Sequence, residues 1–305
     1  MDSCLAIDIG GTKIAVGVVT EDGALQAKRT VATPQTADAE VLFGALAGLV
    51  EGVRSEAPGV VACGVGCGGP MSEHGEQVSP LNIPAWDAFP LRSRLEVLTG
   101  LRVSIDNDAK ALALAEGWVG AARGRKNFMA MVVSTGVGGG IVSDGRLLDG
   151  RMGNAGHVGH VIVEPDGRRC GCGAYGCLEA EASGRSIMEI TGRPPAEARP
   201  EMIERVGRLV GLGIASVSSL LDLDLTVVAG SVALGFGPPF FDAASAELQR
   251  RARLSFSSEA RVEPAGLGGS GPLIGAGAVA FRAVGRDLCG IAPEGQDGAE
   301  VEEDP

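Results

Sequence analysis

The first 32 residues alternate short apolar runs with turn residues, in the order CLAIDI, GGTK, IAVGVVT, DG and ALQAKRTV. Short apolar runs separated by Gly- and Asp-rich turns are typical of antiparallel strands, so this stretch predicts a three-strand meander. Between Asp38 and Glu56 apolar side chains recur at helical spacing, and VVACGVG follows as a buried strand. Strands followed by a helix and another strand predict an α/β fold.

A similar order of elements begins again at Leu101. The strand VSID leads into the helical segment AKALALAEGWVG, and the strands FMAMVVS and GGIVSDG follow. Further along, the pattern predicts a helix over about 200–221, a strand LTVVAG, a helix after GPPFF and a last helix through PLIGAGAVAFRAVG. Because 305 residues exceed the usual size of one compact domain, we expect two α/β lobes around a central cleft.

We expect the N-terminal lobe to span residues 1–106 and to be completed by the C-terminal helix at about 272–288. The C-terminal lobe should span residues 107–271. It contains, at about 144–179, an insertion rich in Gly, His and Cys that has little periodicity and is too long for a passive connection. The last twelve residues hold six acids and no base, which predicts a disordered acidic tail over 291–305.

The formal net charge of −12 argues against nucleic acid or an anionic membrane as a partner, because both require basic patches. The N-terminus lacks a basic segment followed by a long apolar one, and no apolar run approaches the length of a membrane-spanning helix. We therefore expect a cytoplasmic protein.

Three glycine-rich turns are candidates for binding the phosphates of ATP. The first, Gly10-Gly11-Thr12-Lys13, follows Asp8, a carboxylate that could hold Mg²⁺ through water. Taken alone, this turn is equally well explained as a hairpin with a capping aspartate. A matching turn in the second half contains Thr135 and Gly136, so that two facing hairpins could clamp a triphosphate. The third, Gly230-Ser231, ends a strand where an adenosine could rest against a helix start.

Asn107 and Asp108 lie between the strand VSID and the helix that follows it. Either residue could simply cap that helix. Alternatively, Asp108 could accept the proton of an attacking hydroxyl while Asn107 binds a sugar, because phosphoryl transfer needs a positioned base and polar groups that hold the acceptor. The spacing alone favours neither interpretation.

His160, Cys170, Cys172 and Cys177 have the type and number of ligands that tetrahedral zinc takes in a closed structural site. With no open position, the metal should hold the loop rather than take part in the chemistry. We expect it to direct Asn154, His157 and Glu179 into the cleft. The alternatives are a loop histidine bonded to backbone at His157 and an ordinary first-turn acid at Glu179.

The motifs DIGGTK, NDAKALALAE, STGVGGGIV, GNAGHVGH and CGCGAYGCLE together resemble the ROK family of bacterial repressors and sugar kinases. The resemblance extends from Ile7 to about Gly285 and keeps the family's order of motifs. It implies a two-lobed, actin-like (ribonuclease H-like) ATPase fold and a homodimer or homotetramer.

The resemblance also implies roles for individual residues. Asp108 would be the catalytic base, and Asn107 and Glu179 would bind the sugar. His160 would both ligate zinc and touch the substrate, and Gly69 would make a backbone contact from the sugar-side loop. Family kinases usually read AGExGH where this chain reads AGHVGH, so that His157 replaces a sugar-binding glutamate. A neutral imidazole accepts one hydrogen bond and donates one, whereas a carboxylate only accepts, so the sugar preference should differ.

Our leading hypothesis is a glucokinase of carbohydrate metabolism, an ATP- and Mg²⁺-dependent hexose kinase that phosphorylates the 6-hydroxyl of glucose. The main alternative is an amino-sugar or N-acetyl-hexosamine kinase, for example a kanosamine 6-kinase. A sugar-sensing regulator of the same family is a non-enzyme alternative, but the first phosphate turn begins so early that we expect no DNA-binding domain ahead of it. A noncatalytic sugar-binding protein on the same fold is a third possibility, which the presence of Asp108 disfavours.

Overall fold

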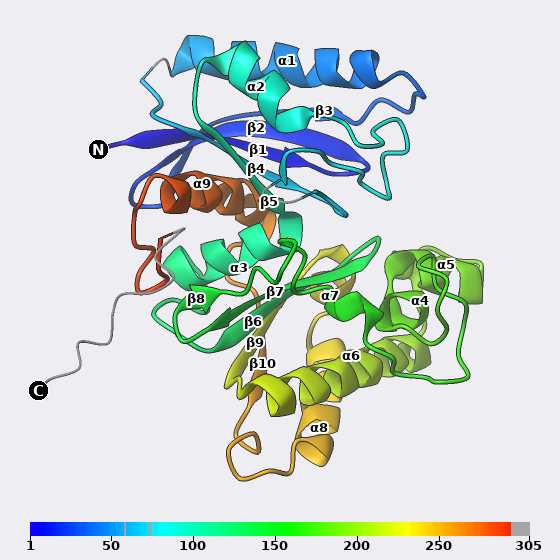
Figure 1. Cartoon of the computed structure of the whole chain (residues 1–305). Helices are drawn as coiled ribbons and strands as arrows, with labels where there is room; N and C mark the ends of the chain where they lie inside the picture. The colour runs from blue at the N-terminus through cyan, green and yellow to red at the C-terminus, as the bar shows by residue number, and fades with distance from the viewer. Residues whose placement is uncertain (58, 73–74, 294–305) are drawn as a thin grey trace, which may run out of the picture.

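The computed structural model describes residues 1–57, 59–72 and 75–293, and these residues form two lobes, each built on a five-stranded sheet (Figure 1). The strand order is β3-β2-β1-β4-β5 in the N-terminal sheet and β10-β9-β6-β7-β8 in the C-terminal sheet. The predicted α/β class and the two-lobed arrangement are therefore confirmed.

The N-terminal sheet begins with the predicted meander. Strands β1 (Ser3–Ile9), β2 (Lys13–Thr20) and β3 (Leu25–Ala32) pair antiparallel, and β4 (Cys63–Cys67) and β5 (Val103–Asn107) extend the sheet in parallel. Helices α1 (Ala39–Glu56) and α2 (Leu91–Thr99) cover one face, and α9 (Gly271–Ala283) covers the other (Figure 1). Helix α1 begins where the sequence predicts, because Asp38 accepts a hydrogen bond from the backbone N–H of Glu40 at 2.8 Å.

The C-terminal sheet is buried on both faces. Its strands are β6 (Phe128–Val133), β7 (Val137–Ser143), β8 (Arg146–Leu147), β9 (Leu225–Ala229) and β10 (Arg261–Pro264). Along β6, Phe128 and Ala130 pack on the side of α3 (Asp108–Val119), whereas Met129 and Met131 pack on the side of α6 (Pro200–Leu221) and α8 (Pro238–Arg251). This two-sided burial explains why β6 is apolar throughout instead of alternating.

Smaller elements surround this sheet. They are the 3₁₀ turns η2 (Val158–His160), η3 (Pro195–Glu197) and η4 (Gly268–Ser270) and the helices α4 (Leu178–Ala182), α5 (Gly184–Thr191) and α7 (Ser231–Phe236). Helices α4 and α5 lie at the side of the C-terminal lobe in Figure 1, next to the end of α6.

Helices α3 and α9 lie between the two sheets and pack directly on each other (Figure 1). Glycines permit the close approach of α9 to β4 on one side and to α3 on the other. A Cβ on Gly64 would lie 1.9 Å from the carbonyl oxygen of Ala276 on α9, and a Cβ on Gly275 would lie 2.6 Å from the carbonyl oxygen of Ala111 on α3. One apolar core therefore runs from β1 through α9 and α3 to β6, and it joins the two lobes.

The folded part of the chain extends further toward the C-terminus than predicted. Ile291 is fully buried, and the backbone N–H of Ala292 donates to the carbonyl of Gly145 at 2.8 Å. Residues 291 and 292 thus belong to the folded body, so the predicted tail over 291–305 starts too early. The rest of that predicted tail, residues 294–305, lies outside the described residues.

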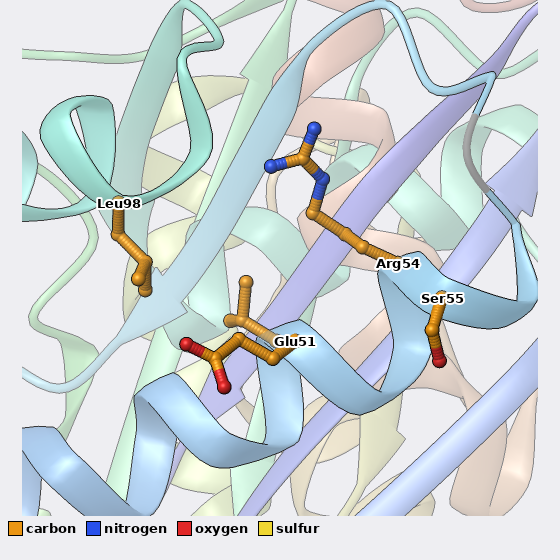
Figure 2. Close-up of a pocket in the computed structure, with 5 residues that line it drawn as sticks. Glu51, Arg54, Ser55 and Leu98 are labelled. Atoms are coloured by element: carbon orange, nitrogen blue, oxygen red, sulfur yellow. The ribbon is translucent and has the colours of Figure 1, made fainter.

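A hollow of about 340 Å³ lies between α1 and α2, lined by Glu51, Arg54 and Leu98 among others (Figure 2), and contains none of the predicted site residues. Among the residues that the structure describes, no helix combines the length and apolar character needed to cross a bilayer.

Candidate active site

The junction of β5 and α3 carries the two polar residues that the sequence singled out. Asn107 caps α3, because its Oδ1 accepts the backbone N–H of Ala109 at 3.0 Å, and Asp108 Oδ1 accepts the same N–H at 2.9 Å. The capping interpretation is therefore correct. Capping does not exclude a role in sugar binding and catalysis. Within the described chain, the cap uses Oδ1 of each residue and leaves Asn107 Nδ2 and Asp108 Oδ2 for a substrate.

The environment of Asp108 suits a proton acceptor. Its side chain is exposed to solvent, but partial desolvation by the surrounding protein raises the pKa of the carboxyl above its ordinary value. The N–H of Ala109 and the nearby His157 act in the opposite direction. A carboxylate with a raised pKa accepts a proton more readily than a free aspartate, which is the property required of a base near neutral pH.

A buried lysine fixes this junction against the second lobe. The Lys110 side chain is 1% exposed, and its Nζ contacts Asp106 Oδ1 at 2.8 Å, Asp149 Oδ1 at 2.7 Å and the carbonyl of Gly153 at 3.1 Å. Burial alone would lower the pKa of the ammonium, but the two carboxylates raise it above its usual value. Arg282 of α9 supports Asp149 from the other side at 3.2 Å.

The loop that follows Gly153 brings two predicted sugar-binding residues to the same place. Asn154 Nδ2 donates to the carbonyl of Met71 in the N-terminal lobe at 3.2 Å and to that of Met152 at 3.1 Å, so this side chain bridges the lobes. A Cβ built on Gly69 would lie 3.8 Å from both Asn107 Nδ2 and the His157 ring. Gly69, Asn107 and His157 therefore converge from three separate segments.

The imidazole of His157 has a pKa below its ordinary value. Burial lowers the pKa of its imidazole, and the neighbouring His160, whose ring centroid lies 6.0 Å away, lowers it further. Asp108 and Glu179 oppose this shift without cancelling it. The proximity of these carboxylates places His157 beside the candidate base.

Glu179 lies closer to the second glycine turn than the sequence indicates. Its Oε2 accepts the backbone N–H of Val137 at 2.9 Å, and a Cβ on Gly136 would lie only 2.6 Å from that oxygen. One oxygen of this first-turn acid of α4 is thus used to hold the start of β7. A contact of Glu179 with a sugar remains a prediction.

The first glycine turn connects β1 to β2 and leaves its polar groups accessible. Its backbone is closed by the bond from Gly10 N–H to the carbonyl of Lys13 at 3.0 Å, and the side chains of Thr12 and Lys13 are exposed. At the end of β1, Asp8 is 8% exposed, and burial followed by repulsion from Asp108 raises its pKa to about 7. The two carboxylates are therefore neighbours, an arrangement that a Mg²⁺ ion would stabilise.

The second and third glycine turns touch each other. The hydroxyl oxygens of Ser134 and Ser231 lie 3.0 Å apart, and the side chains of Thr135 and Ser231 are exposed. Gly230, between β9 and α7, adopts a φ of 102°, a conformation that favours glycine. All three turns thus present accessible backbone or hydroxyl groups, and two of them form a single surface.

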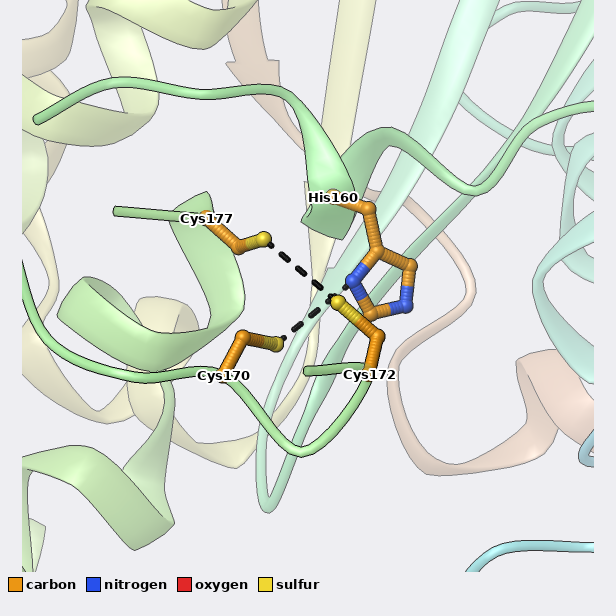
Figure 3. Close-up of side chains that lie close together, drawn as sticks. All are labelled: His160, Cys170, Cys172 and Cys177. Carbon is orange, nitrogen blue, oxygen red and sulfur yellow. Dashed lines mark hydrogen bonds between the residues drawn. The ribbon is translucent and has the colours of Figure 1, made fainter. Parts of the chain in front are cut away.

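The predicted zinc ligands come together in the insertion (Figure 3). One ligand atom each from His160, Cys170, Cys172 and Cys177 lies within 4.8 Å of all the others. The Cys172 and Cys177 sulfurs are 3.8 Å apart, and Cys170 Sγ is 3.7 Å from His160 Nδ1. Thiolates at about 2.3 Å from a tetrahedral ion lie about 3.8 Å from each other. The residues therefore fit zinc, which would connect η2, where His160 follows His157, to the start of α4.

Comparisons with known proteins identify the family. The family model described as "ROK family" matches residues 4–283. An N-acetylmannosamine kinase of Escherichia fergusonii is 38% identical over 250 residues, covering 76% of this chain and 84% of the relative.

Two solved structures are similar over most of the chain. The ROK family glucokinase of Streptomyces griseus, in complex with glucose and AMPPNP, has a TM-score of 0.81 at 32% identity, covering 92% of this chain and 100% of the other. The ROK hexokinase of Thermus thermophilus has a TM-score of 0.79 at 35% identity, covering 92% and 98%.

The chain therefore belongs to the ROK family, and it is a sugar kinase with the actin-like ATPase fold. The resemblance stated from the motifs, the fold class and the enzyme class are confirmed.

The sequence analysis missed residues that the structure places at this site. Lys110 interrupts an apolar helical stretch and lies four positions after Asp106. This spacing places the two side chains close together, so it could have predicted that Lys110 is buried and paired with Asp106. Asp149 gave no such signal, because its partner is 39 positions away.

Replacing Asp108 by Asn should lower turnover by about 10²–10⁴-fold, because the amide cannot accept the proton of the sugar hydroxyl. The amide oxygen can still accept the N–H of Ala109, so binding of sugar and nucleotide should stay near that of the wild type. Steady-state kinetics with calorimetric binding test this, with Asp242→Asn at an exposed position of α8 as the matched control. Unchanged turnover in Asp108→Asn would remove the assignment.

The pH profile provides an independent test of the same group. Because the base must be ionised and its pKa is raised, kcat/KM in the wild type should fall on acidification at a higher pH than an ordinary aspartate would give. An acid limb that appears only below about pH 4, the ordinary range of aspartate, would contradict a role for Asp108.

Purified protein should contain about one zinc ion per chain, since the four ligands complete one tetrahedral site. Cys172→Ala should lose the metal and also lower the melting temperature, because zinc links two segments of the loop. Cys289→Ala, at an exposed cysteine outside the cluster, should change neither quantity. Metal-free protein of full stability would contradict the zinc site.

Proposed function

We propose that the protein transfers the γ-phosphoryl group of ATP to the 6-hydroxyl of an N-acetylated amino sugar, with N-acetylmannosamine as the first candidate. This choice replaces our leading hypothesis from the sequence, glucose, by its alternative. Curated relatives at 38% identity are named N-acetylmannosamine kinase, in Escherichia fergusonii and in Citrobacter koseri, whereas the glucose-bound structure is 32% identical.

The observation that carries the proposal is the position of His157. It lies beside Asn107 and Gly69 and near Asp108, and the lowered pKa of its imidazole favours the neutral form. An N-acetyl group has both an N–H donor and a C=O acceptor. A neutral imidazole can accept a hydrogen bond with one ring nitrogen and donate one with the other, so it can pair with either group. A carboxylate at this position could only accept, which suits two sugar hydroxyls better.

The residues at the β5–α3 junction would carry out the transfer. Asp108 accepts the proton of the 6-hydroxyl while that oxygen attacks the γ-phosphorus, and the bond from the γ-phosphorus to the bridging oxygen of ADP breaks. Asn107 and His157 orient the sugar ring, with Glu179 and His160 as further candidates for contact. The backbone N–H groups and side chains at Thr12, Lys13 and Thr135 would hold the phosphates, and Gly230 with Ser231 would face the adenosine.

Two metals would have separate roles. Mg²⁺, bound to the triphosphate and held by Asp8 through water, would reduce the repulsion between the phosphate oxygens and the attacking hydroxyl. Zinc on the Cys₃His cluster would fix the loop and so the position of His157, without touching the reaction. A homodimer or homotetramer and a cytoplasmic location remain predictions.

The proposal is tested by an ATP-coupled assay of the wild type with Mg²⁺ and a panel of sugars. The panel should contain N-acetylmannosamine, N-acetylglucosamine, mannosamine, kanosamine and glucose. We expect the highest kcat/KM for N-acetylmannosamine. A higher value for glucose or kanosamine would reject the substrate while keeping the kinase, and no phosphorylated sugar at all would reject the proposed function.

Replacing His157 by Glu should lower the ratio of kcat/KM for the N-acetylated sugar to kcat/KM for glucose by about 10- to 100-fold. This is the change expected when one or two hydrogen bonds to the sugar are lost. His157→Gln is the matched variant, because its amide keeps one acceptor and donors without charge, and it should keep the wild-type order of substrates. Identical profiles in all three proteins would show that His157 does not set the preference.

A further inference from the structure

Arg185 lies at the start of α5, attached to the second glycine turn. The backbone N–H of Gly184 donates to the carbonyl of Ser134 at 2.7 Å, and that of Arg185 donates to the carbonyl of Thr135 at 3.3 Å. Its backbone is thus fixed to the turn that is a candidate for binding phosphate. The sequence analysis gave no role to this residue.

The side chain of Arg185 extends from this turn to the other lobe. Its Nη2 donates to Asn82 Oδ1 at 2.9 Å, across 103 positions of sequence. Asn82 in turn packs against the first glycine turn, since a Cβ on Gly11 would lie 2.7 Å from Asn82 Cβ. Arg185 therefore connects the second glycine turn, through Asn82, to the first.

Among the described residues, no carboxylate neutralises the charge of Arg185. Within the part of the chain that the structure describes, no carboxylate lies within ion-pair distance of its guanidinium, and its hydrogen-bond partner, Asn82, is a neutral amide. A guanidinium has five N–H donors in a planar fork, and the ligand that it binds best is a phosphate or a carboxylate. Its side chain is exposed, so a ligand can reach it.

We infer that Arg185 binds the terminal phosphates of the phosphoryl donor, and that Asn82 holds its side chain in place before the donor arrives. The inference rests on the proposed function, because it takes the donor to be a nucleoside triphosphate between the glycine turns. On binding, the guanidinium exchanges one neutral hydrogen bond for charge-assisted bonds to the phosphate oxygens. It then stabilises the negative charge on the transferring group.

A purely mechanical role would have a different consequence. If Arg185 only ties the lobes together, its partner Asn82 is equally necessary, and Asn82→Ala must reproduce the effect of Arg185→Ala. If it binds phosphate, the two variants differ, because the Asn82 side chain is needed only to orient the guanidinium.

The kinetic experiment compares four variants with the wild type. Arg185→Ala should raise the KM for MgATP about tenfold or more and lower kcat by about 10²-fold, with the KM for the sugar within about twofold. Arg185→Lys should recover part of kcat, because it keeps the charge without the fork. Asn82→Ala should change each constant by less than about threefold, and Arg193→Ala, an exposed arginine just after α5, should change none. Equal losses in Arg185→Ala and Asn82→Ala would overturn the inference.

A binding measurement separates this inference from the proposed function. Titration calorimetry should show that Arg185→Ala weakens binding of AMPPNP about tenfold or more but leaves binding of AMP unchanged. Equal weakening of both ligands, or of neither, would contradict a contact with the terminal phosphates. The result does not depend on the sugar, so a wild type that phosphorylates no sugar would reject the proposed function and leave this test intact.

Discussion

The buried ammonium of Lys110 is the interaction on which the arrangement of the site depends. It contacts Asp106 at the end of β5, Asp149 after β8 and the carbonyl of Gly153. Breaking such a buried pair by removing one partner typically costs about 3–5 kcal/mol, because a charge is left without compensation. Since Asp106 lies two residues before Asp108, and Gly153 directly precedes Asn154, the same ammonium sets the position of the candidate base and of the loop that carries His157.

The helix pair α3 and α9, which contains Lys110, depends on small residues for its packing. Helices α3 and α9 are enclosed by sheets on both sides, so their contacts require glycine and alanine, as Gly64 and Gly275 show. Across this packed centre, Asp8 at the end of β1 and Asp108 at the start of α3 are neighbours. Burial and repulsion from Asp108 disfavour the ionised form of Asp8, and a bound cation would offset the repulsion.

The elements and several site residues could be predicted from the sequence, because their signals are local. The meander over β1–β3, the helix bounds at Asp38 and Leu221, and the zinc ligands all follow from spacing within one segment. Contacts between distant segments could not be predicted. The pairs Lys110–Asp149 and Arg185–Asn82 join residues that are 39 and 103 positions apart. Likewise, one carboxylate oxygen of Glu179 accepts a hydrogen bond from the backbone of the second glycine turn. None of these contacts produces a periodic signal in the sequence. The tail boundary was wrong because one residue, Ile291, is buried by tertiary packing.

In the proposed reaction, the β5–α3 junction presents a sugar hydroxyl to Asp108, and the phosphoryl donor lies on the opposite side of that hydroxyl. A crystal structure with N-acetylmannosamine and AMPPNP tests this most directly. It should show the 6-hydroxyl oxygen within about 2.6–3.2 Å of an Asp108 carboxylate oxygen, the N-acetyl group against His157, and the γ-phosphate between the first and second glycine turns. A sugar bound away from Asp108, or with a different hydroxyl directed at the γ-phosphate, would contradict the account.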